Sequence, residues 1–277
     1  MESNELTIVI VTYKSEEKIF SCLQSIPNNL PVLVVENSNK TDFKKNVENS
    51  YSNVKCILTG FNKGYAVANN IGLKSVKTKF ALVLNPDTTL DKNAVKNFLL
   101  SANNLKDFWL LGPANSQAIE YSSNSKEIIE VDNLKGFAIF FNLEKFEKKY
   151  FDENYFLYFE EIDLCEDVKK RGGKIFLDKK IIIHHDGASS VLKKKNFELE
   201  KSRNWHWMWS SFYYHRKYKG YLIALLIIFP KLFSSILKTI FYQLIFNSKK
   251  KNIYFYRMSG IINSMLGKKS WYRPSLD

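Results

Sequence analysis

The residues best suited to chemistry in this chain follow an apolar run, Phe80–Leu84, which is directly succeeded by Asn85, Pro86 and Asp87. A run without polar alternation is typical of a strand buried on both faces of a helix-covered sheet. Because Pro86 cannot donate to a strand ladder, we expect Asn85 and Asp87 at the carboxyl edge of that sheet. A carboxylate and an amide on one short turn can hold a divalent cation and leave positions for a diphosphate. Alone, the tripeptide would favour an ordinary turn.

Two predicted strands near the start of the chain also end in polar residues. Leu6–Tyr13 and Val32–Val35 are apolar runs separated by a helical pattern that begins after Ser15. This β-α-β order with short connections predicts a parallel pair joined by a right-handed crossover. The second run ends in the turn formers Glu36-Asn37-Ser38-Asn39. Glu36 could accept a hydrogen bond from the ribose or base of a nucleoside that lies over this edge.

A glycine-bracketed turn follows the third predicted strand, Val54–Leu58. Gly60 and Gly64 enclose Asn62 and Lys63, which bring an amide and a cation to the turn. The spacing matches neither a Walker loop nor the G-x-G-x-x-G pattern. Asn70, farther along the helical pattern, is equally consistent with tight packing and with ligand contact.

Carboxylates open a predicted helix after an aromatic stretch. Glu160, Glu161 and Asp163 fall in its first turns, and basic residues close it before Gly172. Acids first and bases last is also what the helix dipole favours. Glu160 and Asp163 share a face by their i,i+3 spacing, whereas Glu161 points elsewhere around the turn. A carboxylate kept ionised at this position could remove a proton from a substrate hydroxyl.

Two short strands, Lys174–Leu177 and Lys179–Ile183, are predicted next, and they end in histidines. His184 at a strand end could donate to a diphosphate or bind the same metal ion as Asp87. A purely structural histidine is the alternative.

Composition limits the function classes. The 277 residues carry a net charge of +13 and three widely spaced cysteines, which suggest neither a disulfide framework nor a zinc site. The first residues show no signal-peptide pattern, so a cytoplasmic protein is expected. Residues 1–190 hold 24 Lys/Arg and 25 Asp/Glu, whereas residues 191–277 hold 17 and 3. The basic charge therefore belongs to the last third of the chain.

That basic segment contains a mostly apolar run, Tyr221–Phe246, interrupted by Pro230 and Lys231. Polar residues recur in the run at helical spacing, which favours a helix in the membrane interface on the inner face of the cytoplasmic membrane. Core packing or a homodimer interface is the main rival, and a true span the lesser one. Binding of nucleic acid is not expected, because the basic residues accompany an apolar helix and no nucleic-acid motif is present. We expect residues 1–215 to form one domain and 216–277 a helical extension.

Taken in order, the motifs resemble one known family. IVIVTYKS, VVENSN, GFNKGYAVANNIGL, LNPD, GFAIFFN, FDENYFLYFEEIDLC with KRGGKI, and HHDGASS run from about Thr7 to Tyr214. This set resembles the inverting family-two glycosyltransferases, and within them the rhamnosyltransferase-like branch. The resemblance implies a GT-A α/β fold with a mixed, mainly parallel central sheet flanked by helices.

The resemblance also implies site residues. Nucleotide contacts would come from Thr12, Tyr13, Glu36, Asn62, Lys63, Gly64 and Asn85, and the metal ligands for Mg²⁺ or Mn²⁺ would be Asp87 and His184. The FEEID stretch resembles the acidic motif of the family, so Glu161 is the first choice as base, with Glu160 and Asp163 in reserve. Glu36 and Glu161 stand where Asp is common in relatives and extend the reach by one methylene.

The implied reaction is a single displacement with inversion at the sugar. The expected donor is dTDP-rhamnose or a UDP-sugar, and the expected acceptor is a lipid-linked or growing glycan of surface polysaccharide assembly. A catalytically silent carbohydrate-binding or scaffold subunit with the same fold is the alternative from a different class.

Overall fold

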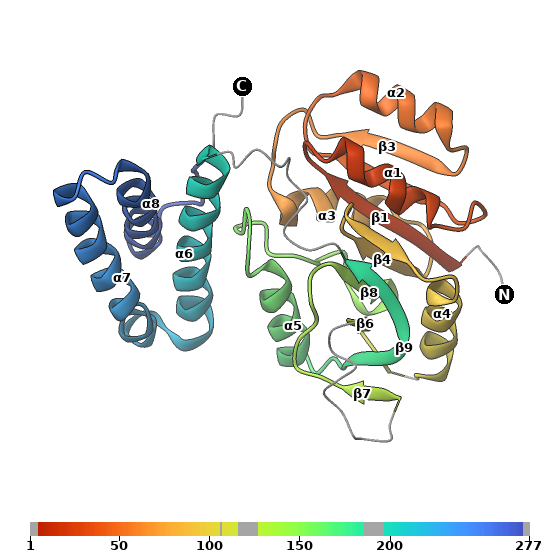
Figure 1. The fold of residues 1–277 in the computed structure, drawn as a ribbon. Coiled ribbons are helices and arrows are strands. Elements are labelled where there is room, and N and C mark those ends of the chain that lie inside the picture. Colours follow the sequence, from red (N-terminus) through yellow and green to blue (C-terminus); the bar gives the residue numbers. More distant parts are fainter. Residues whose placement is uncertain (1–4, 106, 116–126, 186–196, 274–277) are drawn as a thin grey trace. The chain divides into compact units, whose positions relative to one another are not determined.

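The structure, a computed structural model, describes residues 5–105, 107–115, 127–185 and 197–273. The chain divides into two compact units (Figure 1). The sheet unit carries the β-sheet with helices α1 to α5, and the helical unit carries helices α6 to α8 together with the segment Glu153–Glu160. The predicted residues Asp186–Ser189 lie outside the described part of the chain.

The described part of the sheet unit contains a mixed sheet with the order β3-β2-β1-β4-β8-β6-β9-β5, and β7 pairs with β9. Strands β1 to β4 are mutually parallel, as predicted for the first pair, and β8 runs antiparallel to both β4 and β6. The predicted α/β fold with a mixed central sheet is therefore confirmed. The strands are β1 (Leu6–Thr12), β2 (Val32–Glu36), β3 (Val54–Leu58), β4 (Phe80–Leu84), β5 (Thr88–Leu90), β6 (Leu110–Asn115), β7 (Ile128–Glu130), β8 (Ala138–Asn142) and β9 (Ile175–His185).

The central strand β4 is buried at every residue, because both of its faces are covered. Phe80 packs on Phe140, which stacks in parallel on Phe98 of α4 with ring centroids 5.0 Å apart. This packing anchors the first residue of β4, and the predicted site begins at the other end of the strand, after Leu84. The helices of this unit are α1 (Glu16–Gln24), α2 (Thr41–Ser50), α3 (Tyr65–Ser75), α4 (Ala94–Asn104) and α5 (Glu160–Lys170), whose first residue is shared with the helical unit.

The structure differs from the sequence-based prediction in the strand that leads to His184. Before α4, which begins at Ala94, the Asp91 side chain accepts from the backbone N–H of Asn93. The two strands expected before His184 form the single strand β9. The register of β9 against β6 shifts between Pro113 and Ala114, so β9 is irregular where a break between two strands was expected.

The helical unit consists of α6 (Phe197–Lys219), α7 (Tyr221–Leu244) and α8 (Ser248–Met265) with the loop 153–160. Its core is formed by Met208, Phe212, Ala224, Ile228 and Ile261, which come from all three helices. The domain division predicted between residues 215 and 216 stays a prediction; in the structure this position lies inside α6, which packs on α7 and α8. Within the described residues, only α7 is long and apolar enough to cross a membrane by length and composition.

Candidate active site at the carboxyl edge of the sheet

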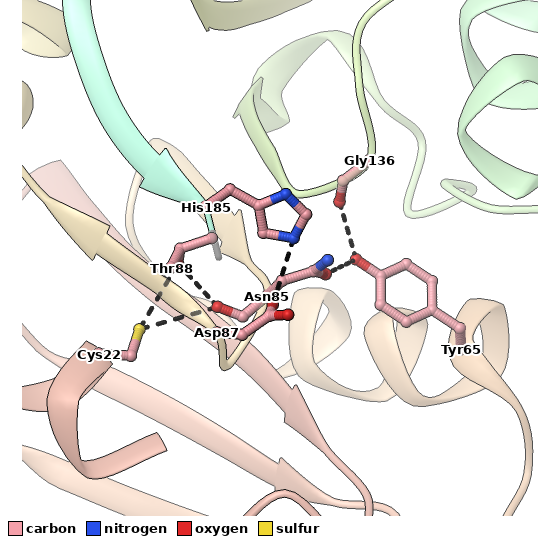
Figure 2. Close-up of polar contacts among 7 residues, drawn as sticks. All are labelled: Cys22, Tyr65, Asn85, Asp87, Thr88, Gly136 and His185. Carbon is pink, nitrogen blue, oxygen red and sulfur yellow. Dashed lines mark hydrogen bonds and ion pairs between the residues drawn. The ribbon is translucent and has the colours of Figure 1, made fainter. Parts of the chain in front are cut away.

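In the turn after β4, the backbone N–H and the backbone carbonyl of Asn85 are both hydrogen-bonded. The N–H of Asn85 donates to the carbonyl of Phe137 at 2.9 Å. The carbonyl of Asn85 accepts from the Thr88 hydroxyl at 2.7 Å and from the buried Cys22 thiol at 3.8 Å (Figure 2). These hydrogen bonds hold the turn in place, and the turn sets the direction of the Asp87 side chain.

The Asp87 carboxylate is buried, with 3% of its side chain exposed. Its Oδ1 lies 3.3 Å from Nε2 of His185, a distance that suits an ion pair, yet Oδ1 has no hydrogen-bond partner in the described part of the chain (Figure 2). The His185 ring is stacked on Phe137 at 4.9 Å and is held beside the carboxylate. Buried polar atoms are normally satisfied. An unsatisfied carboxylate oxygen beside an imidazole therefore fits a bound cation.

The histidine at Asp87 is His185, whereas the sequence pointed to His184. β5 pairs antiparallel with β9 and places Thr88 opposite His185 and Thr89 opposite His184. Since successive strand residues point to opposite faces, only His185 faces the Asp87 side, and His184 is exposed. The role of His184 as a metal ligand stays a prediction. The pairing of the three-residue strand β5 had no signal in the sequence that would have identified His185.

Among the described residues, no group of three or more His, Cys, Asp or Glu side chains is arranged to hold a metal ion. The local donors are the carboxylate of Asp87 and the imidazole of His185. Mg²⁺ and related ions bind nucleotide enzymes through one or two protein groups, with phosphate oxygens and water completing the shell. The residues present fit that mode and do not fit an all-protein metal cage.

Tyr65, the first residue of α3, connects the Asp87 turn to a neighbouring loop. Its hydroxyl lies 3.0 Å from both Oδ1 of Asn85 and the carbonyl of Gly136, and its single hydrogen serves the two acceptors (Figure 2). A Cβ at Gly136 would lie 3.4 Å from the Cβ and Cγ atoms of Glu161. The loop at Gly136 therefore lies next to the first turn of α5.

The three acidic residues at the start of α5 differ in exposure. Glu160 and Asp163 are buried, whereas Glu161 is half-buried and contacts the Gly136 loop. Burial raises the pKa of the Glu161 carboxyl, and hydrogen bonds from the backbone N–H groups of Glu161 and Ile162 oppose that rise. Glu161 is thus the carboxylate of this helix that lies next to the Asp87–Tyr65 group and remains partly accessible.

The predicted nucleoside residues meet at the neighbouring strand ends. Thr12 and Glu36 are register partners in the parallel pair β1–β2, and each is 1% exposed. Burial raises the pKa of Glu36, whose carboxylate also accepts from the Ser38 hydroxyl. Oγ1 of Thr12 has no hydrogen-bond partner among the described residues. Tyr13, next along the chain, is half-buried.

Asn37 organises the glycine-bracketed loop, although the sequence singled it out only as a turn former. Its Oδ1 accepts from the N–H of Lys63 at 2.9 Å, and its Nδ2 donates to Oδ1 of Asn62 and to the carbonyl of Gly64. Gly64 has φ +89°, a conformation that favours glycine, and α3 begins at the next residue. The loop therefore delivers the amino end of α3, which suits an anion, to the same sheet edge.

Asn70 has a structural role. Its side-chain amide donates to the carbonyl of Phe151, and its Oδ1 accepts from the N–H of the same residue at 3.0 Å. Of the two alternatives left open by the sequence, the structure supports packing, because both ends of the amide hold the chain that leads to α5.

Residues 7–163 match Glycosyl transferase family 2, which is more than half of the chain. The chain belongs to this family, as its motifs predicted. It is 26% identical over 189 residues to the low-salt glycan biosynthesis hexosyltransferase Agl10 of Haloferax volcanii, covering 58% of this chain and 61% of that protein. It is 28% identical over 140 residues to the teichoic acid poly(glycerol phosphate) polymerase of Staphylococcus epidermidis, covering 48% and 19%. The chain thus spans less than two thirds of each of these relatives.

Solved structures share the fold. The mannosyltransferase PcManGT from Pyrobaculum calidifontis, in complex with GDP-Man and Mn²⁺, superposes with a TM-score of 0.58 at 11% identity, covering 96% of this chain and 88% of that one. S. aureus TarS in complex with UDP-GlcNAc gives 0.53 at 14% identity, covering 97% and 93%. The fold is that of the GT-A glycosyltransferases.

Proposed function

We propose that this glycosyltransferase moves a hexose from a nucleotide sugar to a glycan acceptor with inversion, and that Asp87 holds the required divalent cation. The observation that carries the proposal is the buried Asp87 oxygen, which lacks a hydrogen-bond partner among the described residues and lies beside His185. When bound, Mg²⁺ or Mn²⁺ would neutralise charge on the leaving nucleoside diphosphate. Asp87 and His185 are the residues that would hold it. His184, the histidine predicted from the sequence, is the alternative.

The donor would bind along the carboxyl ends of β1, β2 and β4. Thr12, Tyr13 and Glu36 would hold the nucleoside, since Thr12 has an unused hydroxyl and Glu36 a buried acceptor at the same register. Asn62, Lys63 and Gly64 would lie along the diphosphate at the amino end of α3, where backbone N–H groups favour anions. Asn85, held by Tyr65, would complete the edge.

Glu161 would remove the proton from the acceptor hydroxyl. Its raised pKa makes it a stronger base than an exposed Glu, and it remains partly accessible. The acceptor oxygen would attack the anomeric carbon from the face opposite the diphosphate, so one carboxylate suffices and the sugar inverts. Glu160 and Asp163 are the reserve candidates, and their burial makes them less suited to meet an acceptor.

We further propose rhamnose from dTDP-rhamnose as the donor, with a UDP-sugar as the alternative. The acceptor would be a lipid-linked or growing surface glycan at the inner face of the cytoplasmic membrane. The relatives named above act in glycan and teichoic acid biosynthesis by their names, which supports a glycan product but leaves the sugar open. Removal of residues after Tyr218 should move the protein from the membrane fraction to the soluble one.

The test is thermal stabilisation of the purified chain by dTDP-, UDP- and GDP-sugars, each with and without Mn²⁺. A ligand that binds only the folded state raises the melting temperature by mass action. Mn²⁺-dependent stabilisation by one nucleotide class, lost in Asp87→Ala, would support the proposal and identify the donor. A chain that no nucleotide stabilises would instead be the silent scaffold with the same fold.

A further inference from the structure

One side of α7, its outer face, exposes large apolar side chains along the whole helix. Leu226 is 76% exposed and Phe233 53% exposed, although the helix is part of a packed three-helix unit. Soluble monomers rarely expose a continuous apolar surface of this length. The residues of the outer face follow a spacing of three or four, which keeps them on one side of a helix: Leu222, Leu226, Phe229, Phe233, Leu237, Ile240 and Leu244.

The opposite side of α7 forms the core of the helical unit. Ala224, Ile228 and Ser235 are buried there, and the first two pack with residues of α6 and α8. The outer face is therefore not needed to hold the three helices together. Among the described residues, no segment covers the outer face.

The charge around α7 indicates which partner would suit the outer face. Lys201 to Arg273 contains no Asp or Glu in the sequence. Basic residues stand at both ends of α7 and along it, and two of them place their ammonium groups over aromatic rings. Lys238 lies over Tyr254 and Lys250 over Tyr242, at 4.9 and 5.3 Å from the ring centroids. The exposed lysines between Lys201 and Arg273 are Lys217, Lys219, Lys231, Lys238, Lys249, Lys250, Lys268 and Lys269. An apolar stripe flanked by basic charge is complementary to an anionic lipid surface.

The packing of α7 decides between lying in the interface and crossing the membrane. α8 pairs with α7 beyond the shared core, since Tyr254 stacks on Tyr242 at 5.6 Å. α8 carries Lys249, Lys250, Lys251 and Arg257, and it does not qualify as a span by length and composition. A spanning α7 would bring this charged partner into hydrocarbon, which is costly. A helix in the plane of the interface keeps the outer face in lipid and α8 in water.

We propose that the outer face of α7 binds an anionic bilayer surface as an in-plane helix, seated by Leu226 and Phe233 among others and drawn there by the flanking lysines. That this membrane binding brings the enzyme to a lipid-linked acceptor rests on the proposed function. The lipid binding itself needs no catalysis and is tested independently of it.

The first experiment is flotation of the full chain with vesicles of phosphatidylcholine alone or mixed equally with phosphatidylglycerol. Wild type should float with the anionic vesicles and bind neutral ones about tenfold less well. Leu226→Glu and Phe233→Glu should each lower the anionic partition coefficient about tenfold or more. The matched control is Leu100→Glu, at an exposed position of α4 in the sheet unit, which should float like wild type.

Nucleotide-induced thermal stabilisation of the same variants separates the two proposals. A variant that keeps nucleotide-induced stabilisation but no longer floats supports the lipid-binding face. If nucleotides stabilise neither wild type nor any variant, the transferase proposal fails, and the flotation results still decide the lipid-binding proposal. Equal flotation of Leu226→Glu and wild type would overturn the inference. The inference would also be overturned if wild type did not bind vesicles and sedimented as a dimer that Leu226→Glu dissociates. The outer face would then be the contact between two copies of the chain.

The second experiment fixes the orientation. The native cysteines are all buried, so single surface cysteines can be labelled selectively. Lys219→Cys and Ser248→Cys place a thiol just before and just after α7. For chain bound to vesicles from outside, an impermeant maleimide should label both positions to the extent seen without lipid. Protection of one of the two thiols would show a span and contradict the in-plane helix.

Discussion

The sheet unit and the helical unit depart from the usual division between core and surface in opposite ways. At its strand ends the sheet unit buries polar atoms of Thr12 and Asp87 that have no hydrogen-bond partner among the described residues. The helical unit leaves a row of apolar side chains in solvent, including Leu226 and Phe233. Burial of an unsatisfied polar group and exposure of apolar surface both cost free energy. In each unit, these residues mark where a ligand of matching chemistry would offset that free-energy cost: a polar ligand at the strand ends and an apolar one on α7.

The largest effect is expected from neutralising the buried carboxylate at the sheet edge. Asp87→Asn keeps the shape of the side chain and removes its charge, so it should lower the transfer rate by about 1000-fold. The melting temperature without ligand should stay near that of wild type. Sugar transfer measured by release of nucleoside diphosphate checks the rate. The control Asp91→Asn changes an exposed turn residue and should leave the rate nearly unchanged.

Glu161→Gln should lower the rate by about 100-fold to 1000-fold, because it removes the general base. Burial raises the pKa of Glu161, and a base works only when deprotonated. The wild-type rate should therefore fall as pH drops through a value above the ordinary Glu pKa. A wild-type profile with its acid limb at the ordinary Glu value would contradict this assignment.

The same residue predicts a stability effect. The folded state binds the Glu161 proton more tightly than the unfolded state, so stability falls as pH rises from the ordinary Glu pKa through the raised one. Glu161→Gln should therefore melt above wild type at neutral pH and match it in acid. A variant that melts below wild type at neutral pH would show that the ionised carboxylate stabilises the fold.

The two adjacent histidines give a matched pair. His185→Ala should weaken Mn²⁺-dependent nucleotide binding by about tenfold to a hundredfold, since its ring lies at Asp87. His184→Ala should change it little, because that side chain is exposed on the other face of β9. Calorimetric titration of both variants checks the difference. Equal losses would restore His184 as the ligand suggested by the sequence.

A smaller effect is expected at the loop that Asn37 organises. Asn37→Ala removes hydrogen bonds to Lys63, Asn62 and Gly64 and should cost about 1–3 kcal/mol of stability together with some nucleotide affinity. Asn39→Ala, at an exposed position two residues on, should cost much less. Denaturant unfolding measures both. A stable Asn37→Ala variant with unchanged nucleotide affinity would remove the loop from the donor site.

Local patterns predicted much of the sheet unit, because its strands are buried on both faces and end at marked residues. The run before Pro86 predicted β4 and the position of Asp87, and the early β-α-β pattern predicted the parallel pair. His185 was missed because its direction depends on pairing with β5, a strand too short to show a period. Contacts between segments distant in sequence, as in Tyr65 with Gly136, left no local trace either.

The helical unit was harder, because a pattern on one helix does not say which side its neighbours cover. Polar residues recur along α7 as a stripe, and this pattern predicted a helix that lies in the membrane interface. The structure buries Ser235 of this stripe and leaves Lys231 and Lys238 exposed. The apolar outer face was thus encoded in the spacing, but only the packing of α6 and α8 shows that it is uncovered within the described chain.

The most direct test of the proposed metal-assisted site is calorimetric titration of the nucleoside diphosphate that stabilises the chain best, with and without Mn²⁺, into wild type and Asp87→Asn. We expect Mn²⁺ to strengthen nucleotide binding to wild type and to have no effect in the variant, because Asp87 couples the two ligands. Equal Mn²⁺ enhancement in both proteins, or none in wild type, would contradict a metal-assisted nucleotide site at the end of β4.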